Sequence, residues 1–212
     1  MNVIDHPQGS LEWFAARVGK VTASRISAVL AKGRGGEASA TRASYMGELI
    51  AETLTGHPCA IFQGNADTER GIEQEPQARA TYEVRKGVMV DPVGLVVHPR
   101  IERSAASPDG LVGDDGLLEI KCPRPHVHID YLLANEVPSK YVPQMAWQAA
   151  CTGRKWVDFV SYCPQMPAEL QLLVVRFSPS LAYLDELENA VVAFLAEMDA
   201  KLERIAADSS SS

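Results

Sequence analysis

The sequence lacks any long hydrophobic run. None of its apolar stretches approaches the ~18 consecutive residues that would indicate a membrane-spanning helix. The first ten residues are polar and contain no apolar segment of the kind found in signal peptides. We therefore expect a protein that neither spans a membrane nor carries a secretory signal.

Cysteine is scarce, and its spacing disfavours the usual cysteine-based sites. No two of the four cysteines form a Cys-x-x-Cys pair, which is typical of zinc and redox sites; they are Cys59, Cys122, Cys151 and Cys163. We expect them to be reduced thiols of a cytoplasmic protein.

Two common catalytic signatures are also missing. Residues 31–42 are rich in glycine, but they do not match the Gly-x₄-Gly-Lys-Ser/Thr pattern of a phosphate-binding loop. No Gly-x-Ser-x-Gly motif of a serine hydrolase occurs. The glycine-rich stretch is predicted to be a surface loop, and the alternative is a loop that contacts a DNA backbone through Lys32, Arg34 or Arg42.

The chain lacks an excess of positive charge. Its 27 acidic and 20 basic residues give a net charge of −7, which argues against a protein that coats nucleic acid. The charge is uneven, because residues 1–45 hold six basic and three acidic residues, whereas residues 181–212 hold two basic and seven acidic residues. Phosphates respond to the field within a Debye length of about 8–10 Å. A local basic surface could therefore still bind DNA.

The apolar pattern predicts an α/β (α+β) fold with a central mixed β-sheet flanked by helices on both sides. Strands are predicted at 87–99, 107–123, 155–164 and 169–178, and helices at 10–17, 24–30, 42–56, 67–85, 127–137, 139–153 and from Ser178-Pro179 to 205. The length of 212 residues and 46% hydrophobic content suit one domain over residues 1–208. Residues 209–212, all serine, are predicted to be a disordered tail.

The strongest chemical signal is the stretch SPDGLVGDDGLLEIKCP, residues 107–123. Two apolar runs flank a Gly-Asp-Asp-Gly turn, which predicts a half-buried hairpin. Glu119 and Lys121 are two residues apart and project to the same face of a strand, whereas Ile120 projects to the other face.

The register of this hairpin decides whether Asp109 can join them. A two-residue loop at 114–115 would pair Asp109 with Ile120 and turn its carboxylate away from Glu119. A three-residue loop or a glycine bulge would bring Asp109 opposite Glu119 or Lys121. We therefore predict an odd-length or bulged turn.

Two convergent carboxylates can hold a hard divalent cation such as Mg²⁺. A lysine beside them can orient a water molecule and offset negative charge that develops on a phosphate. An aspartate followed by Glu-x-Lys therefore indicates metal-dependent phosphodiester hydrolysis. A charged surface hairpin that arises by chance is the alternative.

The hairpin resembles the active-site hairpin of the PD-(D/E)xK nucleases, and specifically of the phage lambda-type exonucleases, also called YqaJ-type viral recombinases or alkaline exonucleases. Three further motifs of that family occur in its order: RVGKVTAS (17–24), RGIEQEPQARATYE (70–83) and YVPQMAWQ (141–148). The resemblance covers most of residues 11–165 and implies a PD-(D/E)xK, restriction-endonuclease-like core.

The resemblance also implies roles for individual residues. Asp109, Glu119 and the backbone carbonyl of Ile120 would hold Mg²⁺, as one or two ions, with Mn²⁺ as a substitute. Lys121 would act on the attacking water.

Two further polar residues are implied beside these. Glu75 would support the metal site or bind a second ion, with Glu73 as the alternative. Gln144 would position the water, the lysine or the scissile phosphate.

Arg17, Ser24 and Ser107 match the family positions that hold a 5′-phosphate. A guanidinium grips phosphate oxygens with two hydrogen bonds, and hydroxyls add more. The family prototype has one more arginine where this chain has Val127. The candidates to replace it are Arg124, His126 and His128.

The implied activity is a 5′→3′ exonuclease on linear double-stranded DNA that starts at a 5′-phosphorylated end. It would release mononucleotides and leave 3′ single-stranded DNA for recombination by annealing. The implied assembly is a ring-shaped homotrimer that works with a single-strand annealing protein in the cytoplasm, as a phage or prophage protein in a bacterial host. Two alternatives are a PD-(D/E)xK endonuclease, of the restriction or junction-resolving type, and a non-catalytic DNA-binding module.

Overall fold

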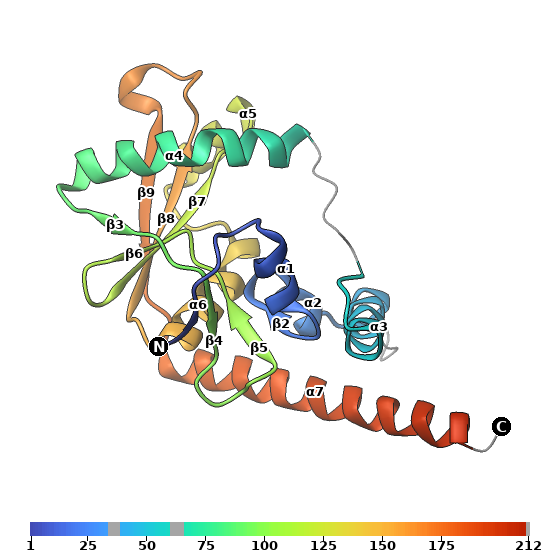
Figure 1. Cartoon of the computed structure of the whole chain (residues 1–212). Coiled ribbons are helices and arrows are strands. Elements are labelled where there is room, and N and C mark those ends of the chain that lie inside the picture. The colour runs from blue at the N-terminus through green and yellow to red at the C-terminus, as the bar shows by residue number, and fades with distance from the viewer. Residues whose placement is uncertain (34–38, 60–65, 211–212) are drawn as a thin grey trace.

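The computed structural model describes residues 1–33, 39–59 and 66–210. The described chain forms two mixed β-sheets with helices packed around them, as Figure 1 shows. The predicted α/β class is therefore confirmed, with the difference that the strands divide between two sheets instead of forming one.

The larger sheet has the strand order β3-β6-β7-β8-β9. In this sheet β7 and β8 run parallel, and the other neighbouring strands run antiparallel. The bounds are β3 Val90–Asp91, β6 Gly110–Val112, β7 Gly116–Lys121, β8 Trp156–Tyr162 and β9 Leu172–Phe177. The predicted hairpin at 107–123 is thus β6 and β7.

The smaller sheet has the order β1-β4-β5-β2 and lies beside the N-terminal helices. Its strands are β1 Asn2–Ile4, β4 Leu95–Val97, β5 Ser104–Ala106 and β2 Val21–Thr22. The helices around it are α1 Leu11–Arg17, the short 3₁₀ turn η1 Ala23–Arg25 and α2 Ile26–Leu30. The segment from 107 to 109 leads from β5 to β6 and so connects the two sheets.

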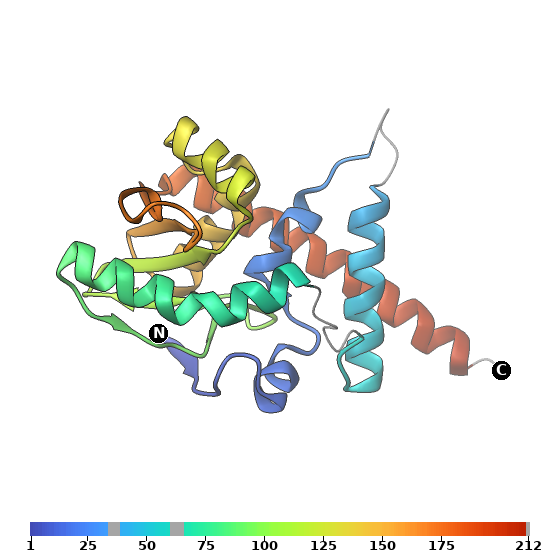
Figure 2. The same ribbon diagram turned by 90° about the horizontal axis from the view of Figure 1, so that it is seen from above.

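Helices cover both faces of the larger sheet (Figure 2). Helix α4 (Ala66–Lys86) lies on one face, while α5 (Pro125–Ala134), η3 (Ser139–Tyr141) and α6 (Val142–Thr152) lie on the other. On the α4 face, β7 joins a cluster made by Leu118, Ile120, Ala78 and Tyr82. On the α5–α6 face it joins a cluster made by Leu117, Phe159, Tyr131 and Met145. Since side chains alternate along a strand, positions 119 and 121 share the α5–α6 face.

The last helix, α7, spans Leu181–Ser210 and follows η4 (Ala168–Leu170) and β9. The predicted start at Ser178-Pro179 is wrong by two residues, because the hydroxyl of Ser180 accepts the backbone N–H of Tyr183 at 3.2 Å and caps the helix there. The helix includes the first two residues of the predicted tail at 209–212. Residues 211–212 lie outside the described chain.

Several ion pairs fasten α7 to the rest of the protein, among them one between Arg100 and Glu188. Arg42, in α3 (Ala40–Thr55), pairs with Glu197 at 2.6 Å, and Arg103 pairs with Asp199 at 2.6 Å. Arg42 is therefore engaged with α7, Lys32 is exposed, and Arg34 falls in residues 34–38, outside the described residues. Over the described ranges, no helix is both long enough and apolar enough to cross a membrane.

Candidate active site

The β6–β7 hairpin has the odd-length turn that the sequence predicts. Val112 pairs with Gly116, which leaves a loop of three residues. Gly113 in this loop has φ +53°, a left-handed conformation that glycine adopts without strain. Continuing the same register places Asp109 opposite Glu119. The two carboxylates are therefore directed to the same side of the hairpin.

The carboxylate of Asp109 is anchored at the end of β7. One of its oxygens accepts the backbone N–H of Ile120 at 2.6 Å. Burial, and then the negative charges of Glu119 and Glu75, raise the pKa of Asp109 well above its usual value, while the ammonium of Lys121 opposes the rise. A carboxylate that is buried among others in this way is stabilised by a cation.

Glu119 is a buried carboxylate surrounded by hydrogen-bond donors. Its side chain is 1% exposed. One oxygen, Oε1, accepts from the ammonium of Lys121 and from the amide of Gln144, the latter at 2.7 Å. The other oxygen, Oε2, accepts from the amide of Gln148. These contacts supply the donors that a buried carboxylate requires.

The ammonium of Lys121 lies between the acidic residues and an aromatic ring. It pairs with Glu119, and it lies 5.2 Å from the centre of the Tyr141 ring. Burial lowers the pKa of Lys121, but the negative charges of Glu119 and Asp109 outweigh this effect and raise it. The side chain is therefore a charged donor.

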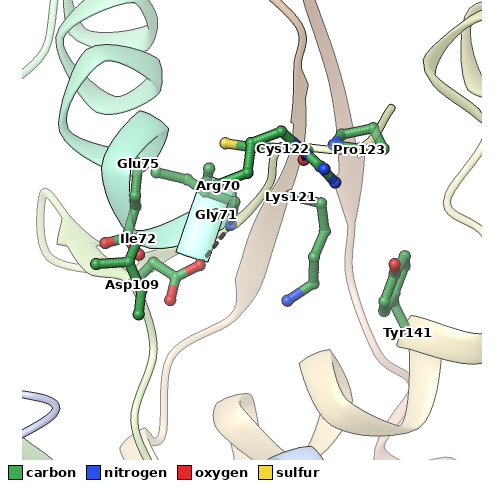
Figure 3. A pocket seen from close by; sticks show the side chains of 10 residues that line it. Arg70, Gly71, Ile72, Glu75, Asp109, Lys121, Cys122, Pro123 and Tyr141 are labelled. Atoms are coloured by element: carbon green, nitrogen blue, oxygen red, sulfur yellow. Dashed lines mark hydrogen bonds between the residues drawn. The ribbon is translucent and has the colours of Figure 1, made fainter. Parts of the chain in front are cut away.

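Asp109 and Lys121 line a cavity of about 390 Å³ (Figure 3), and Glu119 lies buried behind Lys121 without lining it. Its walls come from α4, the residue before β6, the end of β7 with the two residues that follow it, and η3; the lining residues are Arg70, Gly71, Ile72, Glu75, Asp109, Ile120, Lys121, Cys122, Pro123 and Tyr141. In Figure 3 the carboxylates of Glu75 and Asp109 lie on one side of the cavity and Lys121 and Tyr141 on the other. The structure thus brings together residues that are far apart in the sequence.

The structure separates the two predicted candidates on α4. Glu75 lines the cavity and forms an ion pair with Arg79 at 2.8 Å. Glu73 is exposed and is not among the lining residues. The geometry therefore favours Glu75 as the helix-borne acid of this site.

The donor set suits a hard cation better than zinc. Within residues 1–33, 39–59 and 66–210, no three His, Cys, Asp or Glu side chains are grouped closely enough to form a metal site by themselves. Asp109 and Glu119 offer carboxylate oxygens, and Ile120, which lines the cavity, offers a backbone carbonyl. Mg²⁺ prefers oxygen ligands, uses few carboxylates and keeps several waters. Together with the mutual repulsion of the acids around Asp109, these groups fit such an ion.

A second cavity, of about 350 Å³, lies among α1, η1 and α3. Arg17 and Ser24, two of the predicted phosphate-binding residues, line it together with Lys20 and Arg25. Burial lowers the pKa of Arg17, but the normal pKa of a guanidinium is so high that it keeps its charge. Glu48 and Glu52 line it as well, so the three basic and two acidic side chains give the cavity a small net positive charge, and it is called the basic recess below.

Ser107, the third predicted phosphate ligand, is connected to this cavity through a tryptophan. The indole N–H of Trp13 donates to the hydroxyl of Ser107 at 3.0 Å. The guanidinium of Arg17 lies over the same indole ring, 4.1 Å from its centre. Ser107 is two residues before Asp109, so the contacts run from the basic recess to the β6–β7 hairpin.

The three candidates for the missing arginine occupy different environments. Arg124 and His126 are exposed at the start of α5. His128 is fully buried, between the hydroxyl of Ser161 at 2.7 Å and the carbonyl of Leu170 at 2.8 Å. His128 is therefore a core residue and cannot reach a phosphate.

The sequence analysis misses Arg70, Tyr141 and Gln148. Arg70 lines the main cavity, and its Nε donates to the carbonyl of Cys122 at 3.2 Å. Gln148 follows Gln144 by four residues, a spacing that places both on one face of a helix. That spacing predicts Gln148 as a second residue of the site, but only once Gln144 is known to face it.

A comparison with models of protein families gives a match over most of the chain. Residues 12–155 match the family described as YqaJ-like viral recombinase domain. A search of curated proteins gave no match.

Solved structures give a closer comparison. An alkaline exonuclease, LHK-Exo from Laribacter hongkongensis, is 45% identical, and the match covers 95% of this chain and 99% of that chain with a TM-score of 0.88. The same protein in complex with dAMP matches equally well. A phage-related exonuclease from Haemophilus somnus is 16% identical, with coverage of 88% and 96% and a TM-score of 0.68, which supports the fold alone.

Proposed function

Because the chain belongs to the family of YqaJ-like viral recombinase domains, we propose that it is a metal-dependent deoxyribonuclease of the PD-(D/E)xK type. We propose that it degrades one strand of linear double-stranded DNA in the 5′→3′ direction from a 5′-phosphorylated end. The observation that carries this proposal is the convergence of Asp109, Glu119 and Lys121, which the three-residue turn of the hairpin makes possible.

The cofactor of this reaction would be Mg²⁺, with Mn²⁺ as a substitute. Asp109, Glu119 and the carbonyl of Ile120 would hold it, and Glu75 would support them or contribute to a second ion. When bound, the ion would supply a Lewis acid and a more acidic water molecule.

The chain's own polar residues would act on the phosphate and the water. The ammonium of Lys121 can hold the attacking water and offset the negative charge that develops on the phosphate. Gln144, which shares Glu119 Oε1 with Lys121, keeps the lysine and the carboxylate in place. Fixing reacting groups in this way contributes to the rate because the geometry is organised before the reaction begins.

The basic recess would bind the 5′-phosphate through Arg17, Ser24 and Ser107. Trp13 connects the two cavities. It contacts Arg17 of the basic recess and donates to Ser107, which is two residues before Asp109 of the main cavity. A terminal phosphate held in the recess would fix the position of the DNA end relative to the hairpin. Arg70 or Arg124 could take the place of the arginine that the family prototype has near Val127.

Replacing Arg17 by alanine is expected to remove the preference for 5′-phosphorylated over 5′-hydroxyl ends. One charge-assisted contact to phosphate contributes about 1.5–3 kcal/mol, so the ratio of the two rates should fall by roughly 10–100-fold. Initial rates on the two linear duplexes measure this ratio. Arg25→Ala is the matched control, because Arg25 lines the same recess but pairs with Glu48 at 3.0 Å. Equal losses on both DNA ends in Arg17→Ala would refute the proposed role.

The expected product is a mononucleotide together with 3′ single-stranded DNA. A relative 45% identical to this chain forms a complex with dAMP, which supports a mononucleotide product. Family membership supports two further proposals, a ring-shaped homotrimer and a single-strand annealing protein as partner. It likewise supports a phage or prophage origin and action in the cytoplasm of a bacterial host.

The direct test is incubation of the purified protein with end-labelled linear duplex in Mg²⁺ or in a chelator. Degradation in Mg²⁺ alone supports the proposal. Cutting of closed circular duplex would favour the endonuclease alternative, and DNA binding without any cleavage would favour the non-catalytic module.

A further inference from the structure

The Glu119 carboxylate accepts a hydrogen bond from Gln148, a residue that does not line the cavity. Its two oxygens have different partners: Oε1 has Lys121 and Gln144, and Oε2 has Gln148. Since Lys121 lies in the cavity wall, Oε1 is the oxygen on the lysine side, and Oε2 is held from the α6 side.

Gln148 is fully buried, and half of its amide is unused. The side chain is 0% exposed. Its Nε2 donates to Glu119, whereas its Oε1 has no hydrogen-bond partner among the residues that the structure describes. A buried carbonyl without a partner is unfavourable. The alternative orientation of the amide is worse, because it would place Oε1 against the Glu119 carboxylate.

An apolar side chain at position 148 would pack as well as Gln148 does. The residues that flank Gln148 along α6 are apolar and buried, namely Met145, Ala146, Trp147, Ala149, Ala150 and Cys151. A leucine or methionine at position 148 would avoid the unpaired carbonyl. The one feature that only the amide supplies is a donor for Glu119 Oε2.

We infer that Gln148 is a positioning residue for the metal site: it holds the Glu119 carboxylate in the orientation that binds the divalent cation. The inference rests on the proposed role of Glu119 as a metal ligand. Gln144 and Gln148 together fix both oxygens from one helix face, so that the carboxylate does not have to reorder when the ion arrives. Residues that hydrogen-bond to metal ligands typically contribute 10–100-fold to metal affinity.

Titration of the DNA-free protein with Mn²⁺ in a calorimeter tests this inference without any measurement of activity. Gln148→Met keeps the length of the side chain and removes the donor. Its Kd for Mn²⁺ is expected to rise by roughly 10–100-fold relative to the wild type. Thermal melting of the same samples reports whether the variant is folded. If Gln148→Met does not fold, Gln148→Asn, which keeps an amide but is too short to reach Glu119, replaces it with the same expected rise.

Ser161→Ala is the matched structural control. Ser161 is also fully buried and hydrogen-bonded, to His128, and it pairs in register with Lys121 across β7 and β8. Loss of this hydrogen bond is expected to lower the melting temperature, but the Kd for Mn²⁺ should stay that of the wild type. Wild-type affinity in folded Gln148→Met, or an equal loss in Ser161→Ala, would overturn the inference. Absence of Mn²⁺ binding to the wild-type protein would instead reject the proposed metal site itself, and the inference with it.

Discussion

Replacing Lys121 by alanine is expected to lower the rate of phosphodiester cleavage by about 10³-fold, the effect of removing one preorganised donor from developing negative charge. DNA binding should change little, because Lys121 supplies only one of the positive charges that a DNA backbone would meet. Single-turnover rates on labelled linear duplex measure the loss, and a binding titration on the same DNA measures the affinity.

Lys140→Ala is the matched control for this substitution. Lys140 also lies over the ring of Tyr141, 4.8 Å from its centre. It does not line the cavity, and Glu119 pairs with Lys121 instead. Its removal should leave the cleavage rate nearly unchanged. If Lys121→Ala cleaves as fast as Lys140→Ala, the lysine does not act in the reaction.

Replacing Asp109 by asparagine is expected to have opposite effects on activity and stability. Cleavage should fall by about 10³-fold, since a neutral amide is a poor ligand for a hard cation. The free energy of unfolding of the metal-free protein should rise by about 1 kcal/mol, which is typical when a residue kept for function at a cost in stability is replaced. The raised pKa of Asp109 shows that the folded protein disfavours its charged form. Asparagine carries no charge, so the substitution is expected to raise the free energy of unfolding.

The asparagine side chain can still accept the N–H of Ile120, so that the hairpin keeps its anchor. Kinetics of DNA cleavage and urea unfolding with a chelator present measure the two effects. Asp114→Asn, at the exposed tip of the same hairpin, removes the same charge and should change neither quantity. A destabilised Asp109→Asn would show that the carboxylate has a structural role instead.

The sequence alone predicts the hairpin that carries the chemistry, for reasons that are local. The alternation of Glu119, Ile120 and Lys121 fixes their faces on a strand, and the structure places Ile120 in the cluster with α4. Gly113 and Gly116 permit the odd-length turn, and Gly116 is also required sterically, because a Cβ there would lie 2.1 Å from the Trp156 ring.

Other parts of the site depend on packing between distant segments, which local patterns do not specify. The indole of Trp13 reaches Ser107, 94 residues away. Gln148 reaches Glu119 only because α6 packs on the face of β7 that carries the charged residues. The division of the strands into two sheets also depends on distant segments, because β2 pairs with β5 although α3 and α4 lie between them in the sequence.

The start of α7 shows a limit even for local signals. Ser178-Pro179 and Ser180 both offer a capping hydroxyl within three residues. The structure uses Ser180, whose hydroxyl reaches the N–H of Tyr183. Residues 178–180 therefore connect the end of β9 at Phe177 to the start of α7 at Leu181.

The most direct test of the central claim is degradation, in Mg²⁺, of linear duplex with a label at the 5′ or the 3′ end of one 5′-phosphorylated strand, beside a closed circle of the same DNA. We expect the 5′ label to appear at once as a mononucleotide, the 3′ label to remain in long strands, and the circle to stay closed. Nicking of the circle, or early release of the 3′ label, would contradict a 5′→3′ exonuclease.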